Sequence, residues 1–218
     1  PSTNIIEDLI EFMSTWNLTD YYVRLWSDLI LLGFVDNRQL NNRIIERYLT
    51  LLIHSDSEHL SNDQIKQYGN IARQILQRFP LTSDELDNEQ RIEKTNNDQQ
   101  EVDHQQQDRP SLRSNQPKFQ YDGQILSSLI YLLTYANDFD ASWSLYEYYL
   151  SNKSTLIKPL NELGLMSLLS LSVQQNNIDC ALSIVETINE LNYECLSNAL
   201  DLVNRAGHLD NYSRQRLR

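Results

Sequence analysis

The sequence has 218 residues, of which 40% are apolar, and a formal net charge of −12. This length suits one extended domain or two small ones, and two cysteines cannot form the disulfide framework of a small secreted fold. No apolar run reaches the roughly 18–20 residues that a membrane-spanning helix needs. The first residue is Pro1 rather than Met, so we expect the natural N-terminus, with any targeting peptide, to lie upstream.

Residues 80–118 are predicted to form a disordered linker rich in Asn, Gln, Asp and Glu. Its central stretch, residues 87–108, contains only two apolar side chains. Such a segment cannot bury enough apolar surface to offset the entropy that it would lose on ordering. We therefore expect two helical-repeat segments, residues 1–79 and 119–218, on either side of it.

Outside the linker the apolar residues recur at helical spacing. Four of them near the N-terminus follow the i, i+3, i+4, i+7 pattern of one helix face: Ile6, Leu9, Ile10 and Met13. No convincing alternation typical of a strand is present, so the sequence predicts an all-α protein. The predicted helices span residues 4–16, 20–33, 38–54, 62–79, 122–136, 140–151, 158–175, 179–191 and 194–206.

Three of the predicted helical hairpins align with one another, at offsets of 120 and then 39 residues. In each, an apolar cluster precedes an Asn-x-x-Asp turn and an apolar pair follows it. The aligned clusters are Ile6, Leu9 and Ile10, then Leu126, Leu129 and Ile130, then Leu165, Leu168 and Leu169. The aligned pairs are Leu25 and Trp26, then Leu145 and Tyr146, then Ile184 and Val185. Because neither helix of such a hairpin can cover its own apolar face, neighbouring hairpins must stack. Residues 38–54 and 62–79 would form a further, irregular hairpin.

The Asn-x-x-Asp turn has a physical explanation. Asn tolerates the left-handed conformation that ends a helix, and it occurs here at positions 17, 137 and 176. The Asp three residues later, at positions 20, 140 and 179, can accept hydrogen bonds from the free amides of the next helix. We therefore expect Asp140 to cap the helix 140–151.

The chain lacks the motifs of the common catalytic and cofactor sites. Its five glycines are scattered, so no phosphate-binding loop or dinucleotide fingerprint is present. Cys180 and Cys195 are 15 residues apart and do not form a metal-binding pair. One cluster of possible ligands, His54-x-Asp56-x-Glu58-His59, falls in a predicted turn where polar residues are common. We expect no enzymatic activity, no cofactor, no metal, and no small-molecule or membrane partner.

Two groups of residues suit macromolecular binding, although each also has a simpler structural interpretation. The tryptophans Trp16, Trp26 and Trp143 could be binding hot spots, while Trp26 lies beside an apolar stripe and is expected in the core. The C-terminal arginines could contact phosphates or could end a solvated tail. These basic residues are Arg214, Arg216 and Arg218.

The repeated units resemble degenerate pentatricopeptide repeats. The resemblance is clearest in LSSLIYLLTYANDFDASWSLYEYYL (126–150) and recurs in DCALSIVETINEL (179–191). The collinear order of segments 24–34, 41–56, 127–143 and 160–164 is similar to the C-terminal part of a family of pentatricopeptide repeat proteins in the mitochondrial small ribosomal subunit. The fold implied is a stack of helical hairpins, an α-solenoid.

The resemblance also implies mitochondrial localisation and a non-catalytic role in mitochondrial translation. Its implied partners are proteins of the mitochondrial small ribosomal subunit, with rRNA or mRNA as further candidates. Pentatricopeptide repeats read bases with a polar residue on the first helix of each hairpin, and the corresponding positions are Glu7, Ser127 and Met166. Only Ser127 is chemically suitable, so modular base reading is not expected here. The alternative is a generic protein-binding α-solenoid in a cytosolic assembly.

Overall fold

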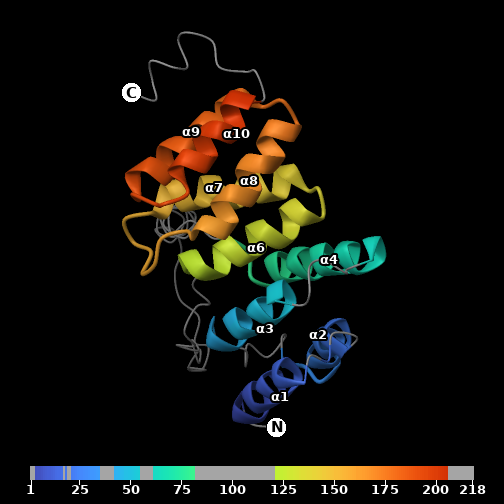
Figure 1. Cartoon of the computed structure of the whole chain (residues 1–218). Helices are drawn as coiled ribbons and strands as arrows, with labels where there is room; N and C mark the ends of the chain where they lie inside the picture. The colour runs from blue at the N-terminus through green and yellow to red at the C-terminus, as the bar shows by residue number, and fades with distance from the viewer. Residues whose placement is uncertain are drawn as a thin grey trace, which may run out of the picture.

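The computed structural model of the chain describes residues 3–16, 18, 21–34, 42–54, 61–81 and 121–205 (Figure 1). Nine α-helices and no strand occur within these ranges, which confirms the all-α prediction. The helices are α1 (Thr3–Thr15), α2 (Tyr22–Leu31), α3 (Asn42–His54), α4 (Asn62–Arg78), α6 (Gly123–Tyr135), α7 (Phe139–Asn152), α8 (Glu162–Gln174), α9 (Ile178–Glu190) and α10 (Leu196–Arg205). Every bound lies within about four residues of the predicted one, because the apolar periodicity of each helix is long and uninterrupted.

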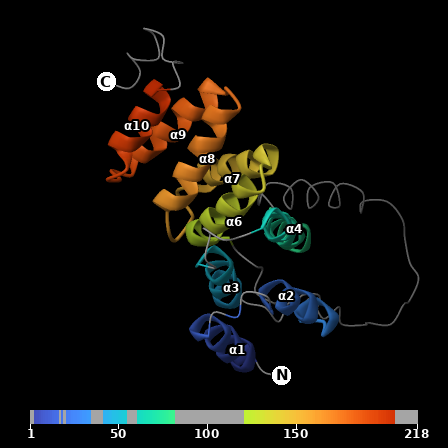
Figure 2. The same ribbon diagram turned by 45° about the vertical axis from the view of Figure 1, so that its right-hand side comes forward.

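The helices are stacked in chain order, from α1 and α2 at one end to α9 and α10 at the other (Figures 1 and 2). One row consists of α1, α3, α6, α8 and α10, in which each helix packs on the next. The other helices flank this row: α4 and α7 pack on α6, α9 packs on α8 and α10, and α2 packs on α4. α3 and α4, expected as a hairpin, each pack more closely on α6 than on each other.

The predicted linker, residues 80–118, lies outside the described residues except for Pro80 and Leu81. The helices that precede and follow it in the sequence share one hydrophobic core. This core runs without a break from Ile6 to Val203, and α6 joins its two parts by packing on α3 and α4 as well as on α7 and α8.

The turn between α6 and α7 and the turn between α8 and α9 have the same backbone geometry. Asn137 and Asn176 both have a φ of 59°, so the predicted left-handed Asn is confirmed at these two positions. The next amide in each case returns to the preceding helix, from Asp138 to the carbonyl of Leu133 at 2.9 Å in the first turn. This is the helix-ending bond of a Schellman motif. Asn17, the third aligned Asn, lies outside the described residues.

The residue that caps the following helix is not the one predicted. Asp138 caps α7 by accepting a hydrogen bond from the Ala141 amide at 3.3 Å, and Asn177 caps α9 in the same way. The left-handed Asn reverses the chain within a single residue, so the next residue already stands at the cap position. Asp140 and Asp179 therefore lie in the first helical turn, and the prediction that they cap these helices is wrong.

Two glycines allow close helix approach, one in α8 and one in α4. A Cβ on Gly164 of α8 would lie 2.8 Å from the Cα of Ser127 in α6. A Cβ on Gly69 of α4 would overlap the methyl group of Ala136, which directly follows α6. Because both obstructing atoms belong to or adjoin the backbone, neither can move away cheaply.

The first helices are joined through aromatic side chains. Trp26 of α2 is buried and stacks on Tyr48 of α3 at a ring separation of 5.6 Å, and its Nε1 donates to Gln74 of α4 at 2.8 Å. The Tyr48 hydroxyl donates in turn to the Tyr22 carbonyl at 2.9 Å. Burial raises the pKa of this hydroxyl well above its ordinary value, so it remains a neutral donor. The expectation that Trp26 belongs to the core is confirmed.

We predict that Asp138→Ala lowers the free energy of unfolding by about 1–2 kcal/mol, the usual loss for a helix cap. The substitution also removes the 2.6 Å contact between this carboxylate and Arg73 of α4. The control is Asp140→Ala, which we expect to cost about 0.5 kcal/mol or less because Asp140 acts only through the helix dipole. Urea unfolding of both variants measures the difference, and an equal or larger loss for Asp140→Ala would contradict the cap assignment.

We predict that Gly69→Ala lowers the free energy of unfolding by about 1–3 kcal/mol through overpacking, although Ala is normally the better helix former. Adding Ala136→Gly to this variant should restore most of the loss, because it removes the methyl group that the new Cβ would meet. Gln67→Ala, at an exposed position on the same helix, is the control. Thermal melts of the parent, these three variants and Ala136→Gly alone test this contact, and additive effects of the two substitutions would exclude it.

Candidate functional site

The three positions that correspond to base-reading residues lie on the first helices of successive hairpins, α1, α6 and α8. Ser127, the one with suitable chemistry, is 1% exposed. Its Oγ donates to the Gly123 carbonyl at 2.6 Å and accepts from the Asn161 amide at 2.8 Å. The hydroxyl therefore joins α6 to the start of α8, and it is inaccessible to an incoming base.

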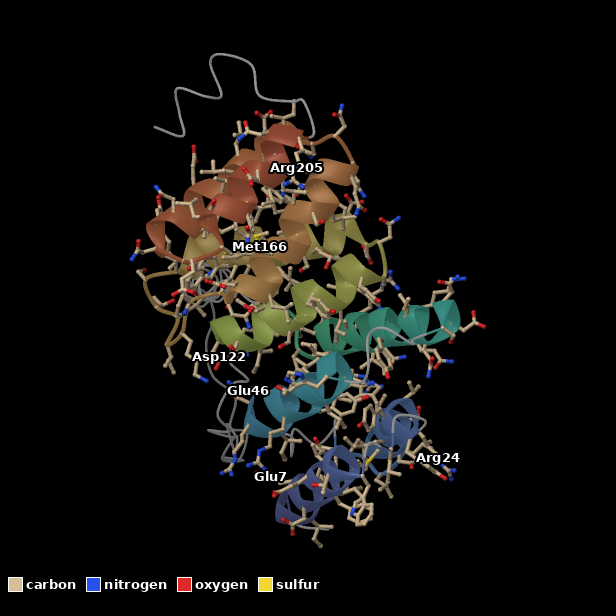
Figure 3. The ribbon with its side chains drawn as sticks, in the orientation of Figure 1. Glu7, Arg24, Glu46, Asp122, Met166 and Arg205 are labelled. Carbon is tan, nitrogen blue, oxygen red and sulfur yellow. The ribbon has the colours of Figure 1, made fainter. Side chains whose placement is uncertain are left out.

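Glu7 and Met166 are no better placed for nucleic-acid recognition. The Glu7 carboxylate lies between two arginines of α3, 3.2 Å from Arg43 and 3.4 Å from Arg47. Met166 is half-buried against the hydrophobic core. Figure 3 shows Glu7 on α1, at one end of the stack, and Met166 several helices away from it on α8. The three positions therefore do not form a line of polar groups that could follow a single strand.

A groove of about 510 Å³ lies between α1 and α3. Arg43 and Arg47 form part of its wall together with His54. Both arginines form ion pairs with Glu7, and Glu11 and Glu46 also line the groove. The positive charge of the arginines is therefore neutralised by neighbouring carboxylates. This groove is therefore a weak candidate for binding phosphate.

The described surface is acidic overall. The described ranges contain 16 Asp and Glu against nine Lys and Arg, and residues 121–205 alone contain ten against three. At least six of the nine basic side chains already form ion pairs within the described part of the chain: Arg24, Arg43, Arg47, Arg73, Lys153 and Lys158. This distribution repels a phosphate backbone and favours partners that carry positive charge.

One lysine joins carboxylates from two parts of the stack. The Lys158 ammonium lies 3.3 Å from Glu46 of α3 and 3.9 Å from Asp122, which caps α6. Figure 3 shows both carboxylates at the same junction, where the row of first helices passes from α3 to α6. All three groups are at least partly exposed, so the cluster contributes to surface charge more than to stability.

The cysteines show no sign of activation. Burial raises the pKa of the Cys180 thiol, and neighbouring Asp179 and Glu147 raise it further; burial likewise raises the pKa of Cys195. Both thiols are therefore protonated at neutral pH. Within the described ranges, no three His, Cys, Asp or Glu side chains gather in a way that could hold a metal ion. Of the cluster His54-x-Asp56-x-Glu58-His59, only His54 belongs to these ranges.

An apolar surface that the sequence reasoning missed lies on α1. Four large side chains one or two helical turns apart are solvent-exposed, and we call them the α1 stripe: Ile5 (55%), Leu9 (41%), Phe12 (53%) and Trp16 (66%). An adjoining groove of about 310 Å³ between α1 and α2 is lined mainly by apolar side chains, among them Phe12 and Tyr21. The i, i+4, i+7, i+11 spacing of the stripe is visible in the sequence, but it lies directly beside the buried face and merges with it.

The remaining sequence candidates differ in accessibility. Trp143 is half-buried, stacks on Phe139 at a ring separation of 6.0 Å and donates to Glu147 at 2.7 Å. Arg205 is exposed at the end of α10, and the arginines at positions 214, 216 and 218 lie outside the described residues (Figure 3). Within the described ranges, no helix has both the length and the apolar character needed to cross a bilayer.

No protein-family model matches the sequence, and no curated protein is significantly similar to it. The functional interpretation therefore rests on the surface chemistry of the described residues and on the alignment of the repeated hairpins.

We predict that Ser127→Ala lowers the free energy of unfolding by about 1–3 kcal/mol, because the Asn161 amide loses its acceptor in a partly buried place. Ser144→Ala, which removes an exposed hydroxyl bonded only to its own helix, should stay within about 0.5 kcal/mol of the parent. RNA affinity should be the same in both variants. A stable Ser127→Ala protein with weakened RNA binding would instead show that this hydroxyl contacts RNA.

Proposed function

We propose that the chain is part of a non-catalytic helical-repeat scaffold of the mitochondrial small ribosomal subunit, which docks chiefly on proteins and supports mitochondrial translation. The observation that carries the protein-docking part is the acidic described surface, on which most basic side chains are already paired. Ribosomal proteins are typically basic because they bind RNA, so an acidic scaffold complements them.

The repeat register supports an α-solenoid related to pentatricopeptide repeats. At an offset of 39 residues, Asp122 and Asn161 both cap the first helix of a hairpin. The same offset relates the left-handed asparagines and the caps of the second helices. Equivalent contacts at equivalent positions are what stacked repeats produce.

The ribosomal part of the proposal is supported by the collinear resemblance to the family of pentatricopeptide repeat domain-containing protein 3. The burial of Ser127 and the occupation of Glu7 by two arginines favour protein over RNA as the principal partner. Exposed apolar side chains within the acidic part, such as Tyr135 and Leu163, supply area for a protein contact.

The second candidate function is a generic protein-binding α-solenoid in a cytosolic assembly. The same acidic surface favours it equally, since charge complementarity does not identify the compartment. Fractionation separates the two, because only the ribosomal proposal requires mitochondrial import and association with the small subunit.

We predict that the tagged natural protein co-sediments with the mitochondrial small subunit in a gradient, and that residues 1–218 bind single-stranded RNA weakly and lose it rapidly as salt rises. Reversing two charges together, Asp140→Lys with Asp179→Lys, should weaken co-sedimentation. Both carboxylates are exposed and belong to residues 121–205, where the acidic residues outnumber the basic ones. The control is Asp8→Lys with Asp63→Lys. It changes the net charge by the same amount, but both positions lie in the described residues before position 82, where acidic and basic side chains balance.

Absence from the small-subunit fractions would exclude the ribosomal proposal. Tight RNA binding that persists at high salt and depends on sequence would exclude protein docking as the principal mode.

A further inference from the structure

The α1 stripe has buried counterparts elsewhere in the stack. The offset of 120 residues that aligns α1 with α6 places Ile5, Leu9 and Phe12 in register with three fully buried residues of α6. These are Ile125, Leu129 and Leu132, none more than 2% exposed. The same register in α8 is occupied by buried residues too: Gly164, Leu168 and Leu171. The stripe is therefore the one copy of this face that is open to solvent in the described stack.

The contacts of α6 and α8 identify what covers this face. On α6, the end of the face at Leu132 and Ala136 lies against Gly69 of α4, and α6 packs on both α3 and α4. On α8, Gly164 lies against Ser127 of α6, and α8 packs on both α6 and α7. In both cases a helix that comes earlier in the sequence lies against this face.

The face of α1 directly beside the stripe is already occupied. Ile6, Ile10 and Met13 are at most 4% exposed, and α1 packs on α3. The apolar surface of α1 is therefore wider than its described neighbours cover: the Tyr22 hydroxyl of α2 reaches the Met13 carbonyl beside the buried face, and the stripe next to it stays open. Four large apolar side chains in a continuous stripe are also unusual on a free surface.

We infer that the α1 stripe is the seat of a further helical hairpin, formed by polypeptide on the N-terminal side of residue 1 and packed on α1 as α3 and α4 pack on α6. The inference rests on the helical-repeat part of the proposed function and is independent of the ribosomal part. An upstream segment is the occupant that the repeat pattern favours, because on both α6 and α8 this face is in contact with an earlier helix of the same chain. The hairpin must present apolar side chains to Phe12 and Trp16, and its second helix must reach the groove between α1 and α2 near Tyr21.

Carbene footprinting with mass spectrometry tests this, applied to the natural polypeptide and to residues 1–218. We expect labelling of Phe12 and Trp16 to be several-fold lower in the natural polypeptide. Ile157, which is 83% exposed in the loop between α7 and α8, should be labelled equally in both and is the internal control. A natural polypeptide that begins at or near residue 1, or equal labelling of the stripe in both proteins, would overturn the inference.

A matched pair of substitutions gives a second readout. Phe12→Asp should lower the melting temperature of the natural polypeptide by several degrees and leave that of residues 1–218 nearly unchanged, because the side chain is exposed there. Ile157→Asp should change neither protein. Equal effects of Phe12→Asp on both proteins would contradict the inference.

Two other occupants would give different patterns, and either would overturn the inference. A second copy would protect the stripe in residues 1–218 at high concentration, together with a doubled mass in light scattering. A partner protein would leave the stripe labelled in the free natural polypeptide and protect it only in purified small subunits. The comparison of the free natural polypeptide with residues 1–218 does not depend on whether the protein co-sediments with the ribosome, so the two proposals fail separately.

Discussion

The burial of α6 over most of its circumference is the constraint on which the rest of the structure depends. Its sequence is apolar around nearly its whole circumference, and ten of its residues, from Gly123 to Thr134, are buried. A helix of this kind is stable only when neighbours surround it. Here α3 and α4 cover one side, while α7 and α8 cover the other. The chain on both sides of residues 82–120 must therefore come together before either part has a complete core.

How far the sequence predicts this arrangement can be judged from particular residues. The helices follow from apolar periodicity alone, and Asn137 and Asn176 follow from the tolerance of Asn for the left-handed conformation. The predicted caps, Asp140 and Asp179, lie two residues beyond the actual ones. The chain turns within a single left-handed residue, and residue preferences do not show how tight that turn is. Asn192 also has a positive φ, of 55°, at the end of α9, outside the Asn-x-x-Asp pattern.

The surface was less predictable than the helices, because exposure depends on neighbours that are remote in sequence. Ser127 is inaccessible since Gly164, 37 residues later, lets α8 approach it closely. Leu9 was grouped with the buried face of α1, yet it is 41% exposed and belongs to the stripe beside that face. Both outcomes depend on which helix covers which side. That information lies in packing rather than in local pattern.

The two parts of the stack differ in surface character. The part that contains α1 to α4 has balanced charge in its described ranges and carries the open apolar stripe, whereas the part from α6 to α10 carries the excess negative charge. One end is suited to extending the stack by hydrophobic contact, and the other to electrostatic docking.

The position of α6 between helices from both parts of the chain has a consequence for fragment complementation. A break in the backbone within residues 82–120 would divide the chain covalently but would leave the contacts of α6 with α3 and α4 unchanged. The two pieces would remain a single particle, held by the same non-covalent interface. They could be encoded by two separate genes and still assemble into one fold, as in split reporter proteins.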